Sequence, residues 1–418
     1  MQQPTINRTR LFYASCIALI VTAMTFAIRA GILSELGAKF NLTDTELGWI
    51  NSMAFLGFPI AMIIGGPLCD IVGMGRLLII AFFSHILGLL LTIFAGGFWT
   101  LFISTFFVGF ANGMVEAACN PLVTAMYTTQ KTKMLNRFHM WFPGGLVIGG
   151  LVSYFLQQAG IGWQVQIATM LVPAVIYGVM FLGQKFPQTE RVASGVSNAE
   201  MLKACRSGLY LLMIFCMFLS ATTELGTNQW IAKIMENTTS NAVLLIVFIS
   251  GIMAVGRYFA GPVEKALSPT LMLLFSSIFA AIGLFWLSNA QGNTAFLAAG
   301  VFAIGVCYFW PTMLGFVAEY IPKSGALGLS LMGGAGMFAT SVFNPILGYF
   351  LDKNRQSALA EGLSAAAAEV KAGQQSLSYV TIFPIVLTVI FFILYMNRKK
   401  YEGNTLHGSG VPQGTAVA

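Results

Sequence analysis

Apolar segments recur along almost the whole chain, with short polar connections between them. A helix needs about 20 predominantly apolar residues to cross the hydrocarbon core of a bilayer. The pattern therefore predicts an all-α polytopic membrane protein with twelve transmembrane helices, at about 11–37, 46–71, 77–96, 98–127, 138–158, 164–184, 208–234, 241–261, 270–289, 294–320, 326–351 and 377–396.

Two polar segments interrupt this series of spans. The first predicts four parts: an N-terminal six-helix half at 1–184, a cytoplasmic connecting loop at 185–207, a C-terminal six-helix half at 208–396 and a cytoplasmic tail at 397–418. The second, 352–376, is rich in Ala, Glu and Gln and is predicted to lie outside as a short surface helix. Six spans on each side of an inner loop are typical of transporters built from repeated halves.

The basic residues predict the orientation of the spans. With the N-terminus in the cytoplasm, 15 of the 22 Lys and Arg residues fall in inner segments and five in outer loops or helix ends. Cytoplasmic loops carry the excess of Lys and Arg. We therefore expect a multi-pass protein of the plasma (inner) membrane with both termini cytoplasmic. The first span has no small-residue cleavage site and is expected to be retained.

Composition supports the membrane assignment and excludes several other classes. The chain is 57% hydrophobic and 9% charged, with a mean hydropathy of +0.78, whereas soluble domains carry about 25% charged residues. The net charge of +7 lies in loops without a basic patch of interleaved aromatics, which argues against a nucleic-acid partner. Six scattered cysteines show no metal-ligand spacing, so no metal or cofactor is expected.

Three polar residues lie four apart within the fourth span. Asn112, Glu116 and Asn120 form one stripe on that helix, and Arg29 lies in the first span. An ionisable group at this depth costs about 2.5–3.5 kcal/mol on insertion scales, so it normally faces a partner or a water-filled cavity. Two compatible interpretations stay open: a packing ion pair between Arg29 and Glu116, or a proton-coupling pair that breaks on protonation.

The seventh span repeats the arrangement with Glu224 and Asn228, followed by Gln229 and Trp230. Carboxamides can hydrogen-bond the hydroxyl groups of a solute, and flat aromatic faces can stack on the C–H face of a sugar ring. We therefore predict these residues, with Asn112, Asn120 and Trp310, as the substrate-binding set. The alternative for both tryptophans is packing or interfacial anchoring.

Both membrane histidines are ambiguous from sequence. His139 in the fifth span is either a hydrogen-bonded structural group or a proton carrier. His85 in the third span is predicted to be structural or to lie at the lipid edge.

The loop GGPLCDIVGMGRLL, 65–78, carries a recurring set of residues between spans two and three. Gly66, Asp70, Gly73 and Arg76 resemble the signature loop of the major facilitator superfamily, although the basic residue is displaced by one position. Gly73 would permit a tight turn, and Asp70 could accept hydrogen bonds from Arg76. We predict that this loop latches the two halves on the inner side; the alternative is an ordinary polar turn.

Longer segments resemble one branch of that superfamily, the fucose/galactose/glucose:proton symporters. These segments are VEAACNPLVTAMY in span four, LNRFHMWFPGGLVIGG in span five, TELGTNQWI in span seven and the region 309–352. The resemblance implies uptake of a monosaccharide with a proton, Glu116 being the coupling carboxylate. Span one departs from the branch: its members carry an acid there, whereas this chain offers Arg29, which favours an anion such as a sugar acid.

The sequence thus predicts a secondary active transporter that works by alternating access, without enzymatic activity. Its expected partners are a small-molecule substrate, a proton or sodium ion and the lipid bilayer, and we expect a monomer. The alternatives are a proton-coupled symporter of an organic anion or sugar acid bound through Arg29, and a receptor that does not transport. An enzyme is disfavoured because the chain lacks HExxH, GxxxxGK[ST] and GxSxG motifs.

Overall fold

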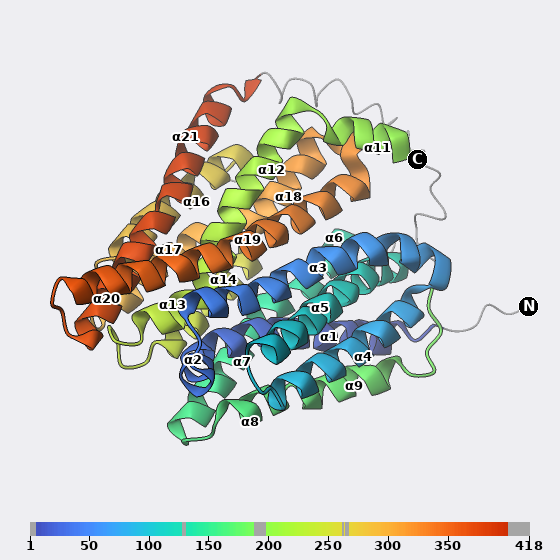
Figure 1. Cartoon of the computed structure of the whole chain (residues 1–418). Helices are drawn as coiled ribbons and strands as arrows, with labels where there is room; N and C mark the ends of the chain where they lie inside the picture. Colours follow the sequence, from blue (N-terminus) through green and yellow to red (C-terminus); the bar gives the residue numbers. More distant parts are fainter. Residues whose placement is uncertain (1–5, 128–130, 188–197, 261–262, 264–266, 400–418) are drawn as a thin grey trace, which may run out of the picture.

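The computed structural model describes residues 6–127, 131–187, 198–260, 263 and 267–399. Within these ranges the chain is helical, with no strand (Figure 1). The elements are α1 (Arg8–Gly31), α2 (Leu33–Phe40), α3 (Asp44–Val72), α4 (Met74–Ile93), α5 (Phe98–Met126), α6 (Lys131–His139), α7 (Trp141–Gln158), α8 (Trp163–Ala168), α9 (Leu171–Phe181), α11 (Asn198–Cys205), α12 (Gly208–Ala221), η1 (Thr222–Gly226), α13 (Thr227–Met235), α14 (Val243–Tyr258), α16 (Pro269–Leu287), α17 (Thr294–Val306), α18 (Phe309–Tyr320), η2 (Pro322–Ser324), α19 (Gly325–Ala360), α20 (Ala365–Val380) and α21 (Ile382–Met396).

The predicted fold class is confirmed. Ten helical stretches of the described residues are long and apolar enough to cross a membrane. The shorter apolar helix α14 and the 36-residue helix α19 provide counterparts for the remaining two predicted spans. Several spans consist of two helices in line: α6 with α7, α8 with α9, α17 with α18, and α20 with α21.

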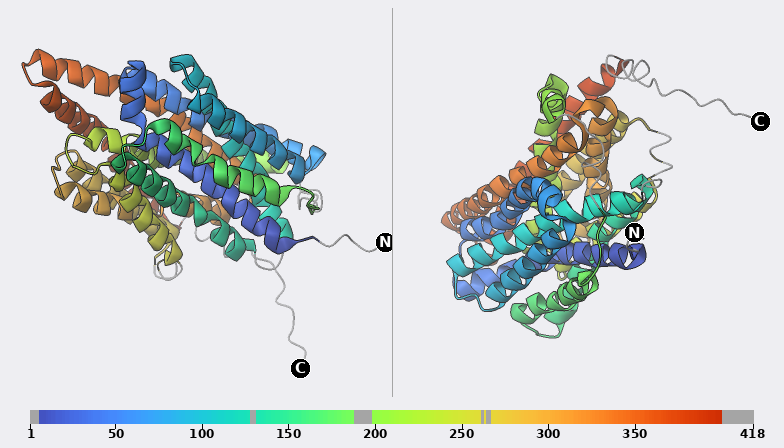
Figure 2. Two further views of the ribbon diagram at one scale, coloured as in Figure 1. Left: turned by 90° about the horizontal axis from the view of Figure 1, so that it is seen from below. Right: turned by 90° about the vertical axis from the view of Figure 1, so that its right-hand side faces the viewer.

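Two predicted boundaries were wrong. The first span ends at Gly31, and the residues that follow form the separate helix α2. The polar insert 352–376 is not an independent surface helix, because α19 continues to Ala360 and α20 begins at Ala365. Ala, Glu and Gln are strong helix formers, so both spanning helices extend beyond their apolar parts. The result is a projecting helical hairpin (Figures 1 and 2).

The two ends of the helix bundle are called the distal end and the proximal end. The distal end carries α2, α8 and the α19–α20 hairpin, whereas the proximal end carries the start of α1, the α3–α4 turn and α11 (Figure 1). Helix α3 runs from a capping box at the distal end, in which Thr43 and Glu46 satisfy each other's backbone N–H groups, to Gly73 at the proximal end. Gly73 adopts φ +87°, a left-handed turn that favours glycine.

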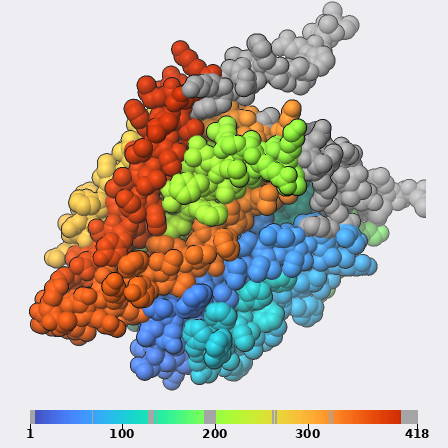
Figure 3. Space-filling model, turned by 45° about the horizontal axis from the view of Figure 1, so that its top comes forward, coloured from blue at the N-terminus to red at the C-terminus, as the bar shows by residue number. Residues whose placement is uncertain are grey.

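The first six spans contact the last six mainly through three helix pairs: α3 with α19, α7 with α14, and α1 with α13. Figure 3 shows α19 (orange) lying along α3 (blue). Their backbones touch near the distal end, where a Cβ atom added at Gly348 would overlap the carbonyl of Asp44, and one at Gly48 would lie 2.5 Å from the carbonyl oxygen of Asn344. Small residues permit such close approach between membrane helices.

Candidate functional site

A narrow central pocket of about 10 Å³ lies between the first six and the last six spans. It is lined from one side by α1, α3 and α7 and from the other by η1, α13 and α19. Its lining residues are Phe26, Phe55, Phe142, Leu146, Leu225, Asn228, Gln229 and Met337. None of these described residues is charged.

Two amide oxygens give this pocket its polarity. Asn228 Oδ1 and Gln229 Oε1 are buried without a hydrogen-bond partner among the described residues, while Gln229 Nε2 donates to the carbonyl oxygen of Phe26 at 3.4 Å. An unpaired buried acceptor costs about 1–3 kcal/mol. The pocket therefore favours a ligand that donates hydrogen bonds and presents an apolar face to the rings of Phe26 and Phe55, whose centroids lie 4.9 Å apart.

The two predicted tryptophan ligands do not line this pocket. Trp230 is fully buried, and its Nε1 donates to Asn344 Oδ1 of α19 at 2.8 Å, so it joins α13 to α19. Trp310 is half-buried and packs beside Gly336 of α19. Packing, the alternative for these side chains, accounts for the observed contacts.

Glu116 and Asn120 lie together, as their spacing predicts. Asn120 Nδ2 donates to Glu116 Oε2 at 2.7 Å, and Asn120 Oδ1 lies 2.9 Å from His139 Nε2. Glu116 is buried, whereas His139 is exposed where α6 ends. A hydrogen-bonded chain thus runs from an exposed imidazole to a buried carboxylate.

Arg29 does not pair with Glu116, so the interpretation as an ion pair was wrong. Its guanidinium donates to Thr105 Oγ1 of α5, and its Nε has no partner among the described residues. Thr105 and Glu116 are eleven residues apart on α5, which is about 16 Å along the helix at about 1.5 Å per residue. The carboxylate lies too far along α5 for the guanidinium that bonds Thr105 to reach it.

Asn112 belongs to a different set of contacts from Glu116. Its Oδ1 lies 2.8 Å from His85 Nε2, and its Nδ2 donates to Thr25 Oγ1 at 2.9 Å. His85 Nδ1 in turn lies 2.8 Å from the hydroxyl of Tyr177. This chain joins α1, α4, α5 and α9 in the interior of the first six spans. Asn112 therefore does not reach the central pocket, and His85 is structural, not at the lipid edge.

Glu224 also does not line the central pocket. Its Oε1 forms an ion pair with Arg257 Nη2 of α14 at 3.2 Å, and both groups lie within the last six spans. The turn that carries Glu224, Thr222–Gly226, is a π-helical turn between α12 and α13.

The proximal loop between α3 and α4 is described only in part. Gly73 makes the predicted turn, Gly66 has no atom within 4 Å of an added Cβ, and Arg76 is exposed. The side chain of Asp70 lies outside the described residues, so the latch between Asp70 and Arg76 stays a prediction.

A cluster at the distal end, which sequence reasoning missed, joins α3 to α13 and α19. Asp44 at the start of α3 is almost fully buried, and its carboxylate pairs with Arg355 of α19 and with Lys233 of α13, the latter at 3.2 Å. Asp352 of α19 accepts hydrogen bonds from the backbone N–H groups of Asp44 at 3.0 Å and Thr45 at 2.8 Å. We call Asp44, Lys233, Asp352 and Arg355 the distal lock.

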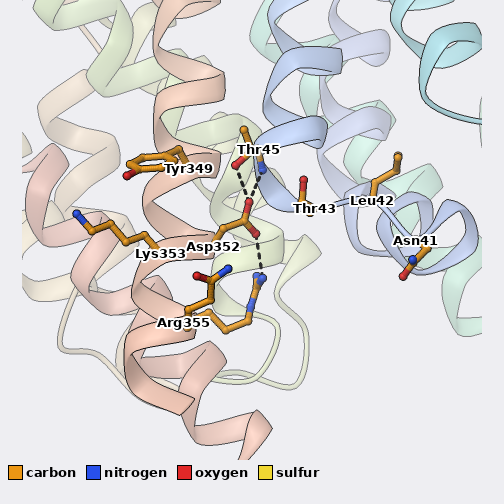
Figure 4. A pocket seen from close by; sticks show the side chains of 9 residues that line it. Asn41, Leu42, Thr43, Thr45, Tyr349, Asp352, Lys353 and Arg355 are labelled. Atoms are coloured by element: carbon orange, nitrogen blue, oxygen red, sulfur yellow. Dashed lines mark hydrogen bonds and ion pairs between the residues drawn. The ribbon is translucent and has the colours of Figure 1, made fainter. Parts of the chain in front are cut away.

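The distal lock borders a surface cavity of about 570 Å³ (Figure 4). In that view Asp352 points from α19 to the backbone and hydroxyl of Thr45, and Arg355 approaches Asp352 from below. A carboxylate at a helix N-terminus satisfies unpaired N–H groups and complements the helix dipole. The only signal for this lock in the residue pattern is the presence of charges in the predicted outer loops.

Residues 15–328 match the Major Facilitator Superfamily. The chain belongs to the Major Facilitator Superfamily. It is 23% identical over 301 residues to a cis,cis-muconate transport protein of Acinetobacter baylyi, covering 64% of this chain and 72% of that protein. It is 25% identical over 155 residues to a D-xylose transporter of Levilactobacillus brevis, covering 37% of this chain and 33% of that protein.

Solved structures of this superfamily share the fold. A variant of the E. coli fucose:proton symporter superposes with a TM-score of 0.57 over 90% of this chain and 98% of that chain, at 14% identity. At this identity the likeness concerns the fold alone. Membership makes the chain a multi-pass membrane transporter and not an enzyme.

Proposed function

We propose that this transporter takes up a neutral, hydroxyl-rich solute of the monosaccharide class together with a proton, by alternating access. The central pocket carries the proposal. Its described lining consists of apolar and aromatic side chains with two unpaired amide oxygens and no charge. The pocket holds about 10 Å³ in the described state, room for about one water, so the sugar would enter once the halves open. Its hydroxyl groups would then donate to Asn228 and Gln229, and the C–H face of the ring would pack on Phe26 and Phe55. The similarity to a D-xylose transporter supports this class.

Glu116 is the proposed coupling group. A carboxylate buried inside a membrane bundle is costly when charged, so gaining a proton makes reorientation of the loaded carrier easier. Asn120 would keep the carboxylate oriented in either protonation state, and exposed His139 at the other side of Asn120 marks the direction from which protons exchange. Because Arg29 bonds Thr105 instead, direct pairing with Arg29 plays no part in the coupling.

The orientation predicted from Lys and Arg places the distal end outside the cell. On that assignment the distal lock closes the outer side of the central pocket, and the described state is closed to the outside. Opening to the outside would separate Asp44 from Lys233 and Arg355, and Asp352 from the start of α3. The two halves would then rock around the central pocket.

Arg29 supports a second candidate, an organic anion or sugar acid. The guanidinium is buried with a neutral hydroxyl as its hydrogen-bond partner, and a buried charge is normally paired. The similarity to a cis,cis-muconate transport protein favours the same class. We place it second because Arg29 does not line the central pocket.

Uptake into proteoliposomes separates the two candidates. D-glucose and D-glucuronate are similar in size but differ in charge. D-xylose is a second neutral sugar. We expect counterflow of a neutral sugar and its accumulation when the outside is acidic. Counterflow of glucuronate alone would replace the proposal with the second candidate, and binding without counterflow would indicate a receptor.

A further inference from the structure

The seventh span is interrupted just before the residues that line the central pocket. Helix α12 ends at Ala221, the π turn Thr222–Gly226 follows, and α13 begins at Thr227. A π turn holds one extra residue relative to an α-helix, and each residue rotates a helix by about 100°. The turn therefore decides which face of α13 points into the pocket, and the observed face carries Asn228 and Gln229.

A single arginine connects this turn to the tenth span. Arg257 Nη2 pairs with Glu224 Oε1 in the π turn at 3.2 Å, and Arg257 Nε donates to the carbonyl oxygen of Cys307 at 2.9 Å. Cys307 lies where the tenth span is broken, between the end of α17 at Val306 and the start of α18 at Phe309. One guanidinium thus joins the irregular points of two spans.

A second bond holds the same break in place. Tyr308 Oη donates to the carbonyl oxygen of Gly256, the residue before Arg257, at 2.9 Å. Two residues after Tyr308, Trp310 packs beside Gly336 of α19, and Gly336 also lies beside Ala221, immediately before the π turn. The contacts therefore run from the seventh span through α14 to the tenth span, and back to the seventh through Gly336 of α19.

We propose that the ion pair between Glu224 and Arg257 is a positioning device, which holds the π turn and so aims Asn228 and Gln229 into the central pocket. Glu224 is then a positioning residue and not a substrate ligand. The proposal rests on the proposed function only in taking the central pocket as the binding site. Burial of a charged pair within an apolar bundle is costly, and π turns occur frequently at functional sites.

The test measures which face of α13 is accessible and needs no solute. Thr227→Cys, Asn228→Cys and Gln229→Cys are made one at a time, and their labelling rates with a small water-soluble methanethiosulfonate are compared. The six native cysteines are buried. Each protein without an added cysteine therefore gives the labelling rate of the native cysteines, which is subtracted. The backgrounds are the parent, Glu224→Gln, Arg257→Gln and the double variant, which leaves no unpaired charge and guards against misfolding.

Tyr210→Phe is the matched control, because it removes a buried hydrogen bond to the carbonyl of Gly328 in the same half but away from the π turn. We expect positions 228 and 229 to be labelled faster than 227 in the parent and in the control. In the three ion-pair variants position 227 should become faster than position 229, because loss of the extra residue moves 227 and 228 to the face that 228 and 229 occupy in the parent. An unchanged order, or an equal rise at all three positions, would overturn the proposal, because the pair would then only add stability.

Because no solute is present, failure of this test would leave the proposed function standing. Conversely, failure of sugar uptake would not affect the labelling order.

Discussion

Asp352 accepts a hydrogen bond from the backbone N–H of Thr45 at 2.8 Å and another from its hydroxyl at 2.6 Å, so a residue of the eleventh span caps the helix of the second. The two residues lie 307 positions apart in the chain. This cap exists only while the two halves are closed at the distal end. Breaking it should therefore change the balance between states of the carrier more than the stability of either half.

Asp352→Asn tests this relationship. The asparagine oxygen can still accept one hydrogen bond, but the charge that complements the start of α3 and pairs with Arg355 is lost. Hydrogen bonds to charged groups contribute about 1.5–3 kcal/mol, so the population of the distally open state should rise by about tenfold or more, at about 1.4 kcal/mol per factor of ten.

The rate of labelling of an added cysteine at Asn228 from the distal side measures this change in sealed vesicles. Glu361→Gln is the control, because it breaks an ion pair with Lys371 that lies entirely within the α19–α20 hairpin. Equal labelling rates in Asp352→Asn and the control would mean that the distal lock does not hold the closed state.

Glu116→Gln should abolish accumulation driven by a pH gradient and leave exchange intact. The glutamine oxygen can still accept from Asn120 Nδ2, so the local geometry is kept while the titratable group is removed. Accumulation and counterflow are measured on the same proteoliposomes. Glu319→Gln, at an exposed carboxylate of α18, is the control. Normal accumulation by Glu116→Gln would exclude this residue from proton coupling.

Trp230→Phe should lower stability without changing affinity for the solute. The indole Nε1 bonds Asn344 Oδ1 inside the last six spans, and its loss leaves a buried acceptor unpaired, at a cost of about 1–3 kcal/mol. A lower thermal midpoint in detergent with an unchanged dissociation constant is the expected pair of results. A higher dissociation constant with an unchanged thermal midpoint would instead mean that Trp230 binds the solute.

The apolar segments of the sequence are enough to predict the fold, but they predict only part of the candidate site. Glu116 and Asn120 meet because residues four apart on a helix are neighbours, which sequence spacing is enough to predict. Trp230 lies away from the pocket because its indole bonds Asn344 of α19, and residue spacing does not encode that contact between distant helices. The π turn before α13 has no signature in this sequence. The contact between Asp352 and Thr45 depends on how two distant helices pack, which residue spacing does not encode.

Arg29→Gln decides between the two substrate classes. Glutamine keeps a neutral N–H donor on the same helix position but ends two bonds short of the Arg29 nitrogen that donates to Thr105, so the variant removes the charge and shortens the side chain. If the solute is neutral, its dissociation constant should change by no more than a factor of about two to three. This corresponds to less than about 0.7 kcal/mol of binding free energy, since a tenfold change is about 1.4 kcal/mol. The pH optimum of transport should also stay in place, because Glu116 lies about 16 Å further along α5 at about 1.5 Å per residue.

An anionic solute held by the Arg29 guanidinium gives the opposite expectation for the same variant. Losing one partner of that charge pair should weaken binding by about 2–5 kcal/mol. Titrations of D-glucose and D-glucuronate at two pH values, with parent and variant, measure both effects. A large loss of affinity for glucuronate at both pH values would establish the anion as the substrate and remove the neutral sugar, because only a direct charge pair with Arg29 makes the affinity depend on the guanidinium.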